Sequence, residues 1–220
     1  MKLLLQKEMK LTALSLTYFF IAFGLMAFLV GYPILLAAFF VCLGIFQTFQ
    51  TARESNDILY TAMLPVAKKN VVSAKYLFCL VIELCAFALM TIATLIRRIF
   101  LSEASLYLSN ALMNANLAFL GYALLVFAAF NIVFVGGFFK TAYGVGKPFL
   151  LFGVVCLLLI GAAETIHFLP VPVLSSLNTT GFSPLFPQLV VLIVGIVFFA
   201  VGTWCSLLVS QKRFEAIDLL

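Results

Sequence analysis

The sequence predicts an all-α integral membrane protein with six transmembrane helices, an N-terminal interfacial helix and a short cytoplasmic helix between the second and third spans. Hydrophobic residues make up 65% of the 220 residues and charged residues only 10%, which is more apolar surface than a soluble core of this length can bury. Apolar runs recur at about the 20-residue length that a bilayer core requires. Strict alternation of apolar and polar residues is absent, which favours helices over a porin-type barrel.

The whole chain is expected to form a single transmembrane domain. Residues 1–11 read MKLLLQKEMKL and predict an amphipathic helix on the membrane surface, because the leucines can face lipid while the charged residues face water. A cleaved signal peptide is disfavoured, since charges recur at Lys7, Glu8 and Lys10 before the first span. The predicted spans cover about residues 12–30, 33–50, 76–96, 114–139, 148–168 and 188–209.

The basic residues predict the orientation of these spans. If residue 1 is cytoplasmic, every Lys and Arg except Arg97 and Arg98 falls on the inner side. This bias places both termini in the cytoplasm. It also explains the net charge of +5 without a nucleic-acid partner, which would need a basic face on a folded module.

The outer connections differ in composition. Gly31-Tyr32-Pro33 predicts a tight hairpin between the first two spans, and residues 100–113 are expected to cross the outer surface. The outer loop 169–187 contains four prolines, which favours an ordered cap or a partly re-entrant segment over a flexible linker.

The inner loop 51–74 is the most polar internal segment. Asn56, or Ser55 before it, is a plausible N-cap, and Asp57 suits the first turn of a short helix that Pro65 ends. A second helix is expected to begin beyond the proline and to run through Lys75 into the third span. One helical face would collect Ile58, Leu59, Ala62 and Met63. Such a helix would move with its spans and could contact a soluble partner; the alternative is an ordinary interfacial loop whose bases face lipid.

This segment resembles the corresponding region of type-2 ABC transporter permeases, in particular the small bacterial branch. The resemblance rests on Asn56-Asp57-Ile58-Leu59, on Met63-Leu64-Pro65-Val66-Ala67-Lys68-Lys69-Asn70-Val71-Val72 and on Ala74-Lys75-Tyr76. Ala67 departs from the pattern, since many relatives carry Ser there.

The resemblance implies a membrane subunit of an ATP-driven exporter in the bacterial cytoplasmic membrane. Its partners would be a cytoplasmic ABC ATPase, which binds ATP and Mg²⁺, and a second copy or a homologous permease. Cargo would be amphipathic or hydrophobic, such as antimicrobial or toxic peptides. The docking face of the coupling helix would comprise Asp57, Leu59, Met63, Leu64, Pro65 and Val66, anchored by Lys68, Lys69 and Lys75.

No catalytic site is expected in this chain. Tyr143-Gly144-Val145-Gly146-Lys147-Pro148 is its nearest approach to a phosphate loop, but Thr141 and Pro148 stand where that motif needs Gly and Ser or Thr. The chain contains one histidine and no HExxH, and its five cysteines form no CxxC. We therefore expect no metal site and no cofactor in this chain.

Polar residues within the spans are the remaining candidates, because ionisable groups in a bilayer are costly and usually face protein or water. For Glu83 and Asn131 we weigh interhelical hydrogen bonding against lining of a translocation path. For Glu164, His167, Arg97 and Arg98, near the outer rim, we weigh a structural Glu164–Arg ion pair against a role in cargo passage.

Two other classes of function stay open. One is a non-transporting membrane sensor, immunity or scaffold protein. The other is a secondary transporter that needs Glu83 and no ATPase, although the chain lacks repeat symmetry.

Overall fold

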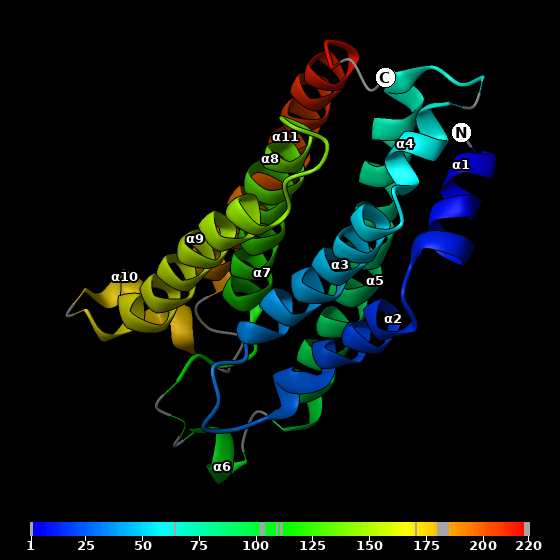
Figure 1. Cartoon of the computed structure of the whole chain (residues 1–220). Coiled ribbons are helices and arrows are strands. Elements are labelled where there is room, and N and C mark those ends of the chain that lie inside the picture. Colours follow the sequence, from blue (N-terminus) through cyan, green and yellow to red (C-terminus); the bar gives the residue numbers. More distant parts are fainter. Residues whose placement is uncertain are drawn as a thin grey trace.

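The computed structural model describes residues 2–63, 65–101, 104–108, 110, 112–169, 171–179 and 185–217, and every regular element in this part of the chain is helical (Figure 1). The elements in order are α1 Lys2–Lys7, η1 Glu8–Thr12, α2 Ser15–Ile21, η2 Ala22–Phe28, α3 Leu36–Glu54, α4 Asp57–Ala62, α5 Lys68–Phe100, α6 Ser105–Leu108, α7 Leu117–Ala129, η3 Phe130–Val135, α8 Gly136–Phe138, α9 Gly146–Thr165, η4 Ile166–Phe168, α10 Pro172–Ser175, η5 Ser176–Asn178 and α11 Leu185–Glu215.

Five helical segments are long and apolar enough to cross a membrane, and they match the second to sixth predicted spans. They are α3, α5, the continuous segment α7–η3–α8, α9 and α11. The first predicted span is divided: Lys2–Thr12 meets Ser15–Phe28 at 96° across extended residues at 13 and 14. A right angle is the geometry expected of an interfacial helix followed by a short span, and counting the pair as one span gives up to six.

The continuous segment α7–η3–α8 forms the centre of the bundle. Of its most apolar window 72% is buried, against 11% for α11. Gly121 on α7 and Gly195 on α11 let these two helices approach closely, because a Cβ at position 195 would come within 2.9 Å of Gly121 Cα. Small residues are a common means of close helix contact in membranes.

Aromatic side chains fill the space between α3, the central segment and α9. The rings of Phe46 and Phe149 stack at 3.8 Å between centroids, and Phe134 packs edge-on against both. The abundance of phenylalanine, 25 residues in all, is thus used in part for interhelical packing.

Both termini lie at one end of the bundle, together with α4 and the turn between α8 and α9 (Figure 1). We call this the inner end. The connection between η2 and α3 and the short α6 lie at the opposite, outer end. Two termini at the same end of the bundle are what an even number of spans would give.

Candidate functional site

The inner loop forms the predicted short helix. Helix α3 continues to Glu54, and two residues connect it to α4. Asn56 adopts a left-handed conformation with φ 54°, which reverses the chain direction and is tolerated by Asn better than by most residues. The helix ends before Pro65, and the next one begins at Lys68.

Four charged side chains tie α4 to the N-terminal segment and to α5. Lys75, only 1% exposed, contacts Glu8 Oε2 at 2.5 Å and Asp57 Oδ2 at 3.0 Å. Lys7 contacts Asp57 Oδ1 and reaches Glu8 Oε1 at 3.1 Å, and it donates a hydrogen bond to Thr61 at 2.8 Å. We call these four charged residues the inner ion network. Its two cations and two anions balance in charge. Because its members come from the N-terminal segment, α4 and α5, it joins three segments that are distant in sequence.

The network also sets the charge state of Asp57. Burial raises the pKa of this carboxyl, but the ammonium groups of Lys75 and Lys7 outweigh burial, and the pKa lies below its ordinary value of 3.8. The stabilisation that this lowered pKa represents is therefore present above about pH 4 and is lost as the pH falls through the folded-state pKa.

The residues predicted to form the docking face lie in different environments. Met63 is 63% exposed, as is its neighbour Tyr60 at 65%. Pro65 is exposed, whereas Leu59 and Val66 are half-buried and Asp57 is engaged in the inner ion network. Leu64 lies outside the described residues. The surface of α4 that is open to a partner is thus centred on Tyr60 and Met63, and Tyr60 was not among the predicted residues.

The three lysines that the resemblance assigns to anchoring each contact protein groups at the inner end. Lys75 does so within the inner ion network. Lys68 donates to the carbonyl of Ile217 at 2.8 Å, and Lys69 pairs with Glu215 at 3.4 Å. The start of α5 is therefore attached to the end of α11, where these two lysines bind protein groups.

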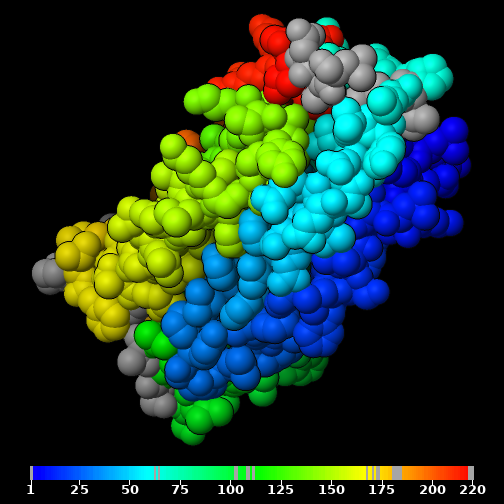
Figure 2. Space-filling model, viewed as in Figure 1, coloured from blue at the N-terminus to red at the C-terminus, as the bar shows by residue number. Residues whose placement is uncertain are grey.

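A pocket of about 180 Å³ adjoins α4 at the inner end. The end of α3, α4 and the turn after α8 line it, and Figure 2 shows the surfaces of these segments (cyan and yellow-green) side by side. Asn56 and Ala142, both on its wall, are the two non-glycine residues with positive φ in the described chain. Arg53 lies over the ring of Tyr143 at 5.5 Å across the pocket, so the end of α3 contacts the turn after α8.

Glu83 and Asn131 form a second polar cluster, buried between the long helices. Asn131 Nδ2 donates to Glu83 Oε2 at 2.8 Å and to Thr203 Oγ1 at 3.2 Å, so α5, η3 and α11 meet at one amide. Glu83 Oε1 and Asn131 Oδ1 have no hydrogen-bond partner within the described structure. Asn131 lies in the π-helical segment η3, and π-helical turns often occur at functional sites.

A chain of hydroxyl groups extends this cluster toward the inner end. Tyr76 Oη lies 2.8 Å from Ser206 Oγ and 2.9 Å from Ser210 Oγ, and Ser206 donates to the Asn131 carbonyl at 2.9 Å. The sequence prediction missed these residues, although the spacing of Thr203, Ser206 and Ser210 places them on one face of a helix.

Arg97 holds the outer ends of three segments together. Its guanidinium donates to the carbonyl of Ala27 at 2.8 Å and to Asn114 Oδ1 at 2.6 Å, and it lies over the ring of Tyr107 at 4.0 Å. Glu164 instead accepts a hydrogen bond from the backbone of Met113 at 2.8 Å. The ion pairs between described residues do not join Glu164 to Arg97. Arg98 is 5% exposed, and the side chain of His167 lies outside the described part of the chain.

Amide side chains form hydrogen bonds that hold the outer cap against the rest of the outer end. The sequence analysis did not identify these contacts. The Asn114 backbone donates to Asn178 Oδ1 at 2.7 Å, and Asn116 donates to the Leu177 carbonyl at 2.7 Å. Gln188 donates to the carbonyl of Ser176 at 3.2 Å. These contacts connect residues 176–178 of the predicted cap to the residues that precede α7 and to the first turn of α11.

In the described residues, no three His, Cys, Asp or Glu side chains gather closely enough to hold a metal ion.

A family model described as ABC-2 family transporter protein matches residues 2–215. No curated protein and no solved structure matches the chain.

Proposed function

The chain belongs to the ABC-2 family of transporters, and from this premise we propose that it is the permease subunit of an exporter driven by a separate cytoplasmic ATPase. The family places it among multi-pass membrane transport proteins. The ATPase would bind ATP and Mg²⁺, both termini would lie in the cytoplasm of a bacterial cell, and a second permease copy or a homologue would complete the membrane part.

The attachment of α4 to its surroundings is the observation that carries this proposal. The inner ion network binds α4 to α5 through Lys75 and Asp57 at 3.0 Å, and a two-residue connection joins it to α3. An element held this way cannot shift without moving the helices on either side of it. A push on the exposed surface at Tyr60 and Met63 would therefore be transmitted into the spans rather than absorbed by a loop.

Cargo would pass at the interface between two permease copies, and its class follows from the resemblance to exporters of amphipathic or hydrophobic molecules such as antimicrobial or toxic peptides. Glu83 and Asn131 are candidates for residues that respond to this movement, because they lie where α5, η3 and α11 meet.

Co-purification tests the proposal. The chain is expressed with the ABC ATPase encoded beside its gene, as wild type and as the Tyr60→Asp/Met63→Asp double variant. The wild type should retain the ATPase in detergent, and the double variant should lose it. Leu106→Asp is the matched control, because Leu106 is 62% exposed and lies on α6 at the outer end. If the folded wild type retains no ATPase, a sensor, immunity or scaffold function replaces the exporter.

A further inference from the structure

A groove of about 400 Å³ lies between the central segment and α9 at the inner end of the bundle, a volume within the range of ligand sites. The lining residues that lie within the spans are apolar, among them Val133 and Leu151. The lining residues at the inner turn include Lys140 and Lys147, both exposed, and none of the lining residues is acidic.

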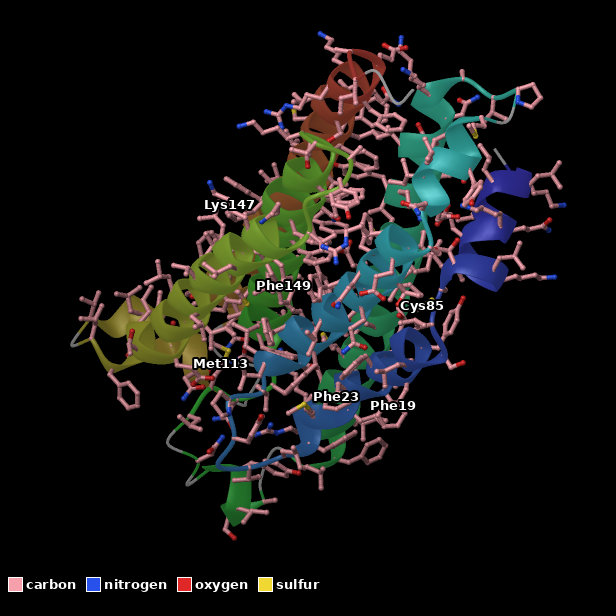
Figure 3. The ribbon with its side chains drawn as sticks, in the orientation of Figure 1. Phe19, Phe23, Cys85, Met113, Lys147 and Phe149 are labelled. Atoms are coloured by element: carbon pink, nitrogen blue, oxygen red, sulfur yellow. The ribbon has the colours of Figure 1, made fainter. Side chains whose placement is uncertain are left out.

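The order of polarity along this groove matches that of a phospholipid. Lys147 and Leu151 are one helical turn apart on α9, a distance of about 6 Å along the axis. Figure 3 shows Lys147 on the side of α9 that faces away from the rest of the bundle, whereas Phe149 points toward the centre of the bundle. The two lysines thus lie at the inner ends of their helices. The apolar walls of the groove begin one turn further toward the middle of the spans.

The positive charge at the mouth of the groove is not neutralised by the rest of the described chain. The ion pairs between described residues include neither Lys140 nor Lys147. Helix α9 has no acidic residue in its first turn, where Lys147 adds a cation to the positive end of the helix dipole. Thr141 Oγ1 accepts the backbone N–H of Gly144 at 2.9 Å and so fixes the turn between the two lysines. An anion at this position would therefore be favoured.

We propose that this groove binds one anionic phospholipid of the adjacent leaflet. Its phosphate would lie at Lys140 and Lys147, and one acyl chain would follow Val133 and Leu151. The bound lipid would link the turn after α8 to the start of α9. The lining of the groove includes no residue of α4, although Thr141 also lines the pocket beside that helix, and the proposed lipid binding does not depend on ATP coupling.

Native mass spectrometry of the purified chain with added phosphatidylglycerol or phosphatidylcholine tests the proposal. We expect one phosphatidylglycerol to bind in preference to phosphatidylcholine. The Lys140→Gln/Lys147→Gln variant should bind phosphatidylglycerol roughly 25-fold more weakly, since each lysine near a lipid surface contributes about fivefold. The Lys2→Gln/Lys10→Gln variant removes equal charge from exposed positions and should bind within about twofold of the wild type.

A second variant tests the apolar part of the site. Leu151, 56% exposed, can be changed to Trp to fill the groove while both lysines remain, and phosphatidylglycerol binding should then weaken by several fold. Equal losses in the two double-lysine variants would show general attraction to basic residues and would overturn the proposal. The proposal would also be overturned if inorganic phosphate bound as tightly as the lipid, or if the Leu151→Cys variant cross-linked to a second copy.

Discussion

Replacement of Lys75 by Met would show how strongly the inner ion network stabilises the fold. The change keeps a long apolar side chain but leaves Glu8, 2% exposed, with Lys7 as its remaining cation. Loss of one partner from a buried ion pair costs about 3–5 kcal/mol. Lys7 still contacts both carboxylates, so we expect a loss near the lower limit, about 3 kcal/mol.

The matched control is Lys69→Met on the same helix. Its ion pair with Glu215 joins side chains that are 55% and 44% exposed, and such surface pairs contribute less than about 1 kcal/mol. A Glu8→Gln/Lys75→Met variant should be more stable than Lys75→Met alone, because the excess buried negative charge is then removed and Lys7 is left with Asp57 as its one anionic partner.

Unfolding of each variant in mixed detergent and SDS micelles can be followed by thiol labelling. Cys42, Cys79 and Cys156 are buried and react only when the bundle opens, whereas Cys85 and Cys205 are exposed and are replaced by Ser in every variant. If the free energies of unfolding of the Lys75→Met and Lys69→Met variants differ by less than about 1 kcal/mol, the inner ion network does not stabilise the fold to the extent expected.

Three further predictions use the same unfolding measurement. Gly195→Ala should lower the free energy of unfolding by about 1–3 kcal/mol, because its Cβ would meet the backbone of α7, whereas Gly153→Ala enters open space and should be neutral or stabilising; equal losses would contradict the proposed helix contact. Asp57→Asn should flatten the pH dependence, since wild-type stabilisation from this carboxyl is lost as the pH falls below about 4, and parallel pH profiles would exclude that origin. Asn131→Leu should cost about 1–3 kcal/mol by leaving the Glu83 carboxyl without its donor, and an unchanged midpoint would show that the amide is dispensable.

The positions of the long helices could be predicted from the sequence because lipid imposes a length on every apolar run. Pro65 likewise separates α4 from α5 for a local reason, since proline disfavours helix at the residue before it. The helix ends were less predictable. The start of α5 at Lys68 agrees with the helix expected beyond the proline, whereas α3 extends to Glu54, past the apolar run that predicted it. A helix already formed in lipid can continue into water without a new nucleation step, so hydropathy does not mark its end.

The polar contacts were predictable only in part. The position of Glu83 inside a span identified it as a residue needing a partner, and the resemblance assigned Lys75 to anchoring. Glu8, however, lies 67 residues from Lys75, and no periodicity relates two segments so far apart. The expected Glu164–Arg pairing illustrates the same limit. Depth in the membrane suggested that Glu164 and one of the two arginines could meet, yet Arg97 donates to carbonyl and amide oxygens. Similar depth does not fix which partner a side chain reaches.

The inner ion network can form only after a defined length of the chain has been synthesised. Lys7 and Glu8 leave the ribosome first, but the network cannot close until Lys75 has been synthesised and the hairpin of α2 and α3 has been inserted. During this interval the N-terminal segment must stay at the inner end with its charges hydrated. All four residues of the network precede the central segment, which begins at Leu117, so closing the network does not require the later helices.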